Sequence, residues 1–165
     1  MTVIKAARVV NLSIDEAWKM LSDFYNVNRI HPWVKTVDKL SEVERGEGAI
    51  RQCNFYDGNS AKEKIVNWDE TNYSFSIVVQ EASLPLKTAT VHFTLSKLAP
   101  TRTKLEAQGN ANMKYGMLGM LMGELVLKPK LSNALQAVFA GTEYYSTTQK
   151  EVPKNWKAPP SAVTA

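Results

Sequence analysis

Arg51 and Glu63 are the two residues whose types and spacing best fit chemistry at a site. A guanidinium anchors anionic or polar groups, and a carboxylate transfers protons as a general acid or base. Burial raises the pKa of such a carboxylate and a nearby guanidinium lowers it, so the net value can suit proton transfer. The alternative is a structural ion pair that joins neighbouring strands, and the sequence leaves both interpretations open.

A β-hairpin is predicted to carry both charges on its inward face. Residues 57–59, Asp-Gly-Asn, form a turn between two strand-like segments. With a three-residue loop, Cys53 lies opposite Glu63, and Arg51 lies one diagonal step away on the same face. That face also carries the apolar residues Phe55, Ala61 and Ile65. Either charge alone is costly in such surroundings, whereas the pair is tolerated.

Composition restricts the classes of function. The chain has 165 residues, of which 44% are hydrophobic and 22% are charged, as in an ordinary globular protein. We expect one domain over residues 1–150 and an irregular tail over residues 151–165. The net charge is +4, and the basic residues are scattered over strands and loops, which favours a solvated surface over a nucleic-acid interface.

The motifs predict no cofactor and no metal site. Cys53 is the only cysteine, so it lacks partners for a disulfide or a zinc site. His31 is interpreted as fixing the His-Pro-Trp turn, and His92 as a surface residue. Because no secretory signal or membrane-spanning apolar stretch is recognisable, we expect no integral membrane association and a cytoplasmic location.

The predicted order of elements is a strand, two short helices, six further strands and a long helix. Ser13 and Glu16 form a capping box for the first helix, and a second helical turn runs from Tyr25 to Ile30. A helical period returns from Gly116 to about Gln149, and Pro129 predicts a short first segment, a kink and a long main helix. The predicted strands are Val3–Asn11, Val34–Val43, Ala49–Tyr56, Ser60–Trp68, Tyr73–Ala82, Leu86–Leu98 and Thr101–Met113.

Two segments are candidates for cavity walls. The inward residues of the last strand are small, notably Gly109, which permits either close approach of a helix or open volume. Four methionines, Met113, Met117, Met120 and Met122, lie within ten residues. They are interpreted as a flexible lip over a cavity mouth, with gap-filling core as the alternative.

The chain resembles the START-like (SRPBCC) superfamily and, within it, the polyketide cyclase/dehydrase family. The resemblance is carried by residues 14–18 (IDEAW), 48–51 (GAIR) and 61–66 (AKEKIV), and by the order of the elements. It implies an α+β helix-grip fold, as in START and Bet v 1-like proteins. In that fold a seven-stranded antiparallel sheet wraps around a long C-terminal helix, with an apolar cavity between them.

Functions within this superfamily are diverse, so the resemblance alone does not define the chemistry. One plant class, the lachrymatory factor synthases, is similar in having an arginine and a glutamate at the positions of Arg51 and Glu63. That similarity implies general acid/base catalysis on a small sulfenic acid. The chain differs from this class at Phe75 and Lys87, which stand near positions where the class places tyrosines.

Two functions of different classes therefore remain. The first, which we favour, is binding of a small hydrophobic or amphipathic molecule, with Arg51 anchoring its polar end. The second is a cofactor-independent cyclase, dehydratase or isomerase in which Glu63 transfers protons beside Arg51. The sparse set of inward polar groups favours binding. The candidate ligand-binding residues are Arg51, Cys53, Phe55, Glu63, Tyr73, Phe75, Phe93, Gly109, Met113, Met117, Met120 and Tyr145.

Overall fold

The computed structural model of the chain describes residues 1–83, 85–114 and 116–160, and Met120 by its backbone alone. Within these ranges seven antiparallel strands form a sheet in the order β1-β7-β6-β5-β4-β3-β2. The strands are β1 (Thr2–Val10), β2 (Val34–Lys39), β3 (Ile50–Phe55), β4 (Ser60–Asp69), β5 (Ser74–Ala82), β6 (Leu86–Ala99) and β7 (Arg102–Met113). The helices are α1 (Ile14–Leu21), the 3-10 helix η1 (Phe24–Arg29), α2 (Gly116–Met122), the π-helix η2 (Gly123–Leu127) and α3 (Lys128–Thr148).

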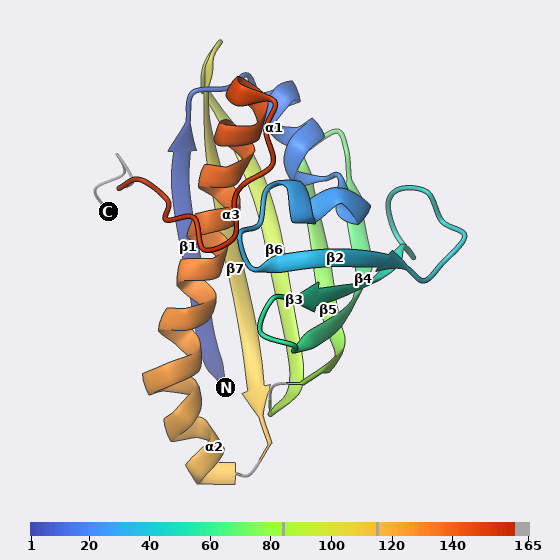
Figure 1. Cartoon of the computed structure of the whole chain (residues 1–165), viewed down its shortest axis with the longest axis vertical. Helices are drawn as coiled ribbons and strands as arrows, with labels where there is room; N and C mark the ends of the chain where they lie inside the picture. Colours follow the sequence, from blue (N-terminus) through green and yellow to red (C-terminus); the bar gives the residue numbers. More distant parts are fainter. Residues whose placement is uncertain (84, 115, 161–165) are drawn as a thin grey trace.

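The curved sheet wraps around α3, as the helix-grip prediction requires (Figure 1). Helix α3 packs against β1, and α1 with η1 covers the sheet beyond the C-terminal half of α3. The predicted capping box is present: Ser13 Oγ accepts from the amide of Glu16, and Glu16 Oε2 accepts from the amide of Ser13 at 3.0 Å. The predicted fold class is confirmed.

The register of the β3–β4 hairpin differs from the prediction by two residues. Arg51 lies directly opposite Glu63, and Cys53 lies opposite Ala61. The turn is displaced by one residue, to 56–58, because the amide of Phe55 donates to the carbonyl oxygen of Asn59 at 2.9 Å and Gly58 adopts a positive φ of 86°. A shift of two residues keeps every side chain on its predicted face, so the inward set is unchanged.

The helical run from Gly116 also differs in detail from the prediction. Pro129 lies in the first turn of α3, and the π-helical segment η2 precedes it, where we expected a kink. A proline has no amide hydrogen and its ring crowds the preceding turn, so the regular α-helical ladder cannot continue through it. The expected short first segment and long main helix are both present.

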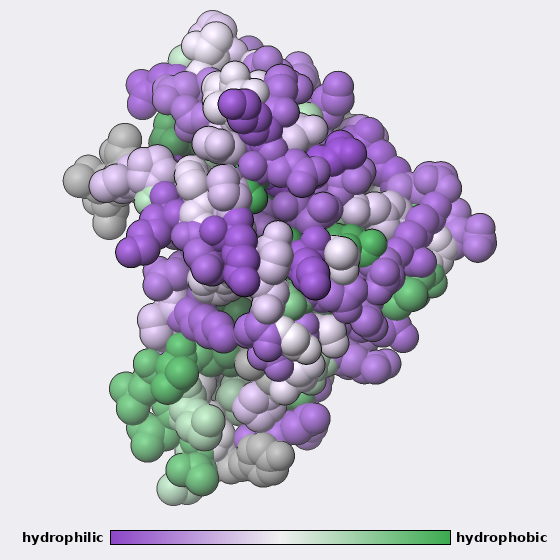
Figure 2. Space-filling model, in the orientation of Figure 1, coloured by the Kyte–Doolittle hydropathy of each residue, from purple (hydrophilic) through white to green (hydrophobic). Residues whose placement is uncertain are grey.

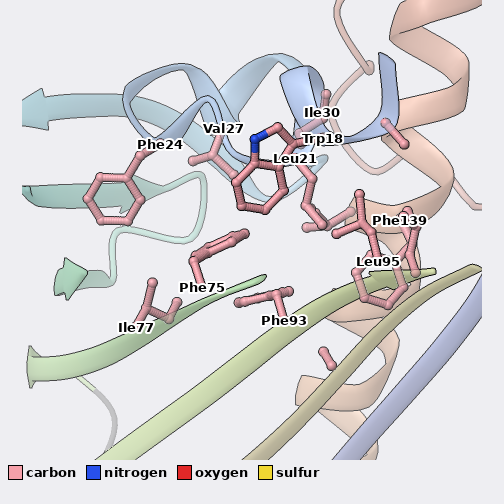
Figure 3. Close-up of a cluster of buried hydrophobic side chains, with 14 of the residues drawn as sticks. Trp18, Leu21, Phe24, Val27, Ile30, Phe75, Ile77, Phe93, Leu95 and Phe139 are labelled. Atoms are coloured by element: carbon pink, nitrogen blue, oxygen red, sulfur yellow. The ribbon is translucent and has the colours of Figure 1, made fainter. Parts of the chain in front are cut away.

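The hydrophobic core lies between α1, η1, the sheet and the C-terminal half of α3 (Figure 3). Phe75 of β5 and Phe93 of β6 stack with ring centroids 4.8 Å apart, and Phe139 of α3 meets Phe93 edge-on at 6.4 Å. Leu21, Phe24 and Val27 cover this aromatic layer from the other side. These contacts hold α1 and η1 over the inward face of the sheet.

The small face of β7 admits the close approach of neighbouring backbone. Ala107, Gly109 and Ala111 are all buried. A Cβ atom on Gly109 would lie 2.8 Å from the carbonyl oxygen of Thr90, so this glycine is needed for strand packing. The sequence left close approach of a helix and open volume as alternatives, and at Gly109 the structure shows close contact with the neighbouring strand β6 instead.

Candidate functional site

An internal cavity of about 560 Å³ lies between the sheet, η1 and α3. The apolar wall residues named below come from six elements, so no single segment of sequence outlines the cavity. That wall includes Leu21, Phe24, Val27, Phe55, Phe75, Ile77, Phe93, Leu131, Ala134 and Val138. Arg51, Cys53 and Glu63 also line the cavity, which brings the hairpin charges and the aromatic layer into one space.

The Arg51–Glu63 ion pair is nearly buried, with side-chain exposures of 9% and 14%. Arg51 Nε donates to Glu63 Oε2 at 2.8 Å, and Nη2 lies 2.5 Å from the same oxygen. The third nitrogen, Nη1, donates to the carbonyl oxygen of Phe24 in η1. The guanidinium carbon also lies 4.0 Å above the ring centroid of Phe24. Arg51 is therefore held by β4 and by η1 together.

The surroundings keep Arg51 charged. Burial alone would lower the pKa of the guanidinium, but at the high pH where this group titrates the negative charges of Cys53 and Glu63 more than offset that effect, so the pKa lies above its ordinary value. Cys53 behaves in the opposite way. Burial raises the pKa of its thiol to about 12, although Arg51 opposes the shift, so the thiol is neutral and unreactive at physiological pH.

His31 is a cavity residue that the sequence analysis did not place in the site. Its Nδ1 accepts a hydrogen bond from the amide of Trp33 at 3.2 Å, which agrees with the predicted role in fixing the turn. Burial, helped by the positive charge of Arg51, lowers the pKa of His31 to about 3. The imidazole is therefore neutral, and its proton is on Nε2 because Nδ1 is an acceptor. Nothing in the local sequence pattern indicates that this turn packs over the hairpin.

The mouth of the cavity is formed by the β3–β4 loop, the start of α3 and the tail after α3. Lys130, Lys154 and Asn155 contribute to its lining. Residues 151–160 of the tail contain no helix or strand, but they are attached to the rest of the fold. The amide of Val152 donates to the carbonyl oxygen of Arg29 at 2.9 Å, and Lys154 Nζ lies 5.1 Å from the ring centroid of Tyr56.

Several predicted site residues lie outside the cavity lining. Tyr73 packs edge-on against Trp18 and donates its hydroxyl to Asp15 at 2.6 Å, away from the cavity. Tyr145 packs against the core, with the guanidinium carbon of Arg29 6.0 Å from its ring centroid. Gly109 serves the strand packing described above. The strand and helix periods identified the apolar faces correctly, but they do not distinguish the core from the cavity wall.

The described methionines of the predicted lip are not among the residues that line the cavity. Met117 is 84% exposed, and Met113 packs near Gly119 and Gly123; neither lines the cavity. The side chain of Met120 lies outside the described part of the chain. Among the described residues, no group of three or more histidine, cysteine, aspartate or glutamate side chains is placed to hold a metal ion. No described helix is long and apolar enough to cross a membrane.

The family described as "Polyketide cyclase / dehydrase and lipid transport" matches residues 1–141, and the chain belongs to this family. No curated protein sequence matches the chain significantly.

Solved structures share the fold at low sequence identity. A START superfamily protein from Mycobacterium smegmatis is similar with a TM-score of 0.72 and 14% identity, over 91% of this chain and 100% of that one. The Zhui aromatase/cyclase from a Streptomyces species is similar with a TM-score of 0.70 and 15% identity, over 91% and 98% of the two chains. Ara h 8.0201 is similar with a TM-score of 0.73 and 14% identity, over 88% and 97%.

Proposed function

We propose that the chain binds a small hydrophobic or amphipathic molecule in the cavity, with its polar end at Arg51 and Glu63. The observation that carries this proposal is a cavity of about 560 Å³ with an apolar interior that meets one nearly buried ion pair. A volume of this size and a few convergent polar groups are typical of sites for small molecules. Membership of the family is consistent with such a role.

The geometry of the pair favours a neutral polar group on the ligand. Arg51 already contacts Glu63 and Phe24, so its charge is balanced and each of its three nitrogens has a partner. Among the described contacts of Glu63, those from Arg51 and Cys53 reach Oε2, so Oε1 is the oxygen left for a ligand. A ligand hydroxyl donating to Oε1 would satisfy both partners without introducing an unpaired charge.

A cofactor-independent cyclase, dehydratase or isomerase is the second candidate. The specific observation in its favour is His31, which adds a neutral imidazole to the cavity wall that holds Glu63 and Arg51. In this mechanism Glu63 would take a proton from a substrate carbon or hydroxyl and return it after rearrangement. Between the two transfers Glu63 would be a neutral carboxylic acid, and Arg51 would stabilise the negative charge left on the substrate.

Occupancy of the cavity is tested with Nile red, a neutral apolar dye whose fluorescence rises on burial. We expect Ala134→Leu, which adds volume inside the cavity wall, to weaken dye binding at least about five-fold. Ala99→Leu, at the end of β6 outside the lining, is the matched control and should bind as the unmodified protein does. Equal binding by a folded Ala134→Leu protein would place the dye elsewhere and contradict the proposal.

The class of function is tested with whatever molecule native mass spectrometry finds bound to the purified protein. Glu63→Gln keeps the shape and a hydrogen-bonding oxygen but removes proton transfer. A carrier should release and rebind that molecule as before. An enzyme should bind it with little change and lose conversion by about 100-fold or more. The double variant Arg51→Met with Glu63→Gln should lose affinity under either function, and normal affinity would show that the pair is purely structural.

A further inference from the structure

Six large apolar side chains of α2 and η2 point away from the protein. We call this surface the apolar tip, and its exposed fractions lie between 45% and 84%. Figure 2 shows it as a hydrophobic area at one end of the molecule, over α2 and the turns that follow. The apolar tip consists of Met117, Leu118, Leu121, Met122, Leu125 and Val126.

This helical segment turns its small residues toward the protein and its large apolar residues outward, which is the reverse of an ordinary surface helix. Its inward positions are glycines: a Cβ atom on Gly119 would lie 1.9 Å from the carbonyl oxygen of Lys114, and one on Gly123 would lie 2.7 Å from Thr2 Oγ1. The glycines thus seat the helix backbone against the ends of β1 and β7. A helix that packed for stability alone would place its large apolar residues inward.

The exposed positions form one continuous row. They recur every four residues, as 117/118, 121/122 and 125/126, whereas an α-helix has 3.6 residues per turn. The wider π-helical turns of η2 offset this drift and keep the row on one side. Figure 1 shows α2 beyond the end of the sheet, so the row forms a projecting ridge rather than the floor of a groove.

The charges beside the ridge are mainly positive. Residues 114–130 contain Lys114, Lys128 and Lys130 and one acidic residue, Glu124. Glu124 is paired with Lys128 at 3.1 Å, so Lys114 and Lys130, both exposed, supply the excess charge. A two-fold pair of such ridges would bring like charges together. An anionic lipid surface attracts the lysines and at the same time takes up the apolar side chains.

We propose that the apolar tip docks the protein on anionic lipid surfaces, with the ridge inserted among the acyl chains near the headgroups and Lys114 and Lys130 on the headgroups. The inference is independent of what the cavity binds, because none of the six residues lines the cavity. Lys130 does line the mouth of the cavity, so docking would bring that mouth close to the lipid.

Co-sedimentation with lipid vesicles tests this proposal. We expect binding to phosphatidylcholine vesicles that contain phosphatidylglycerol. The double variant Leu118→Ser with Leu125→Ser should lower that affinity at least about ten-fold. The matched control is Leu40→Ser with Leu98→Ser, two leucines 46% and 52% exposed outside the apolar tip, and it should bind normally. Thermal unfolding establishes that each variant is folded, and Met117→Ser with Val126→Ser replaces the first pair if it is not.

The charge contribution is tested separately. Lys114→Gln with Lys130→Gln should weaken binding to the anionic vesicles by roughly five-fold for each lysine. The control Lys97→Gln with Lys150→Gln should have little effect. Equal binding of the apolar-tip variants, or no binding by the unmodified protein, would overturn the proposal. A second copy of the chain is the alternative occupant of the apolar tip. The proposal would also be overturned if the protein did not bind vesicles but formed a dimer in sedimentation equilibrium, and if Leu118→Ser with Leu125→Ser dissociated that dimer.

Discussion

The Arg51–Glu63 pair and the apolar tip depart from the usual distribution of side chains in opposite directions. At the pair, two charges lie in an apolar cavity; at the tip, six large apolar residues lie in water. The charges satisfy each other and are further held by the carbonyl of Phe24. The tip residues have no comparable apolar cover among the described residues. The difference suggests that the cavity is complete within the fold, whereas the tip requires something outside it.

The largest expected effect comes from breaking the pair. Arg51→Met leaves Glu63 charged and nearly buried without a partner, and should cost about 3–5 kcal/mol of the free energy of unfolding. Arg51→Met with Glu63→Gln should cost much less than Arg51→Met alone, because no uncompensated charge remains. Urea unfolding of Arg51→Met, Glu63→Gln and the double variant measures these losses. If the loss of the double variant equals the sum of the two single losses, the two side chains do not interact, and the pair is not the stabilised site described above.

Acid should lower the free energy of unfolding through His31, which lies in the cavity wall. Its pKa is lowered to about 3 in the folded protein against an ordinary value of 6.5, so below pH 6.5 the unfolded chain binds more protons. The contribution of the neutral His31 to the free energy of unfolding is therefore fully present above pH 6.5 and is lost as the pH falls toward 3. The contribution lost between pH 7 and pH 4.5 is about 2–3 kcal/mol.

The measurement is urea unfolding at the two pH values for three proteins. His31→Asn keeps an acceptor for the amide of Trp33 but cannot titrate, so it should lose less stability in acid than the unmodified protein. His92→Asn removes a histidine that lies on the surface beside Ser76, and it should behave as the unmodified protein does. An identical acid loss in all three would show that His31 is not held neutral in the cavity wall.

A smaller effect is expected where the tip is attached to the fold. Gly119→Ala should destabilise the protein by about 1–3 kcal/mol, because its methyl group would overlap the carbonyl oxygen of Lys114. The neighbouring change Leu118→Ala should stay within about 0.5 kcal/mol, since that side chain is 68% exposed. Thermal unfolding compares the two. A stabilising Gly119→Ala would mean that helix propensity outweighs packing and that the glycine face does not seat the helix.

The smallest effect is expected on the outer face of the tip. Leu118→Ser and Leu125→Ser, each 68% exposed, should together change the free energy of unfolding by no more than about 1 kcal/mol. The same two changes are those that should abolish most vesicle binding. A loss of several kcal/mol on thermal or urea unfolding would show that the tip packs within the protein, and the contrast with the buried pair would disappear.

The sequence by itself determined which residues share a face. Strand alternation, the capping box at Ser13 and the helical period after Gly116 are local, so they predicted the order of the elements. The helix-grip fold followed from the family resemblance that this order and the matching residues carry. The inward direction of Arg51 and Glu63 was predicted correctly despite a register error of two residues, because such a shift preserves the faces of a strand. These features depend on neighbours along the chain and need no knowledge of the packing.

Tertiary structure decided which inward residues line the cavity and which are covered. The cavity depends on how η1, the sheet and α3 meet, so His31 was missed, and Gly109, Tyr73 and Tyr145 were placed in a site that they do not line. The methionine-rich segment shows the same limit. Its apolar residues predicted contact with the interior, but close backbone contacts at Gly119 and Gly123 turn the opposite face inward. Periodicity shows that a face exists, and only packing shows what covers it.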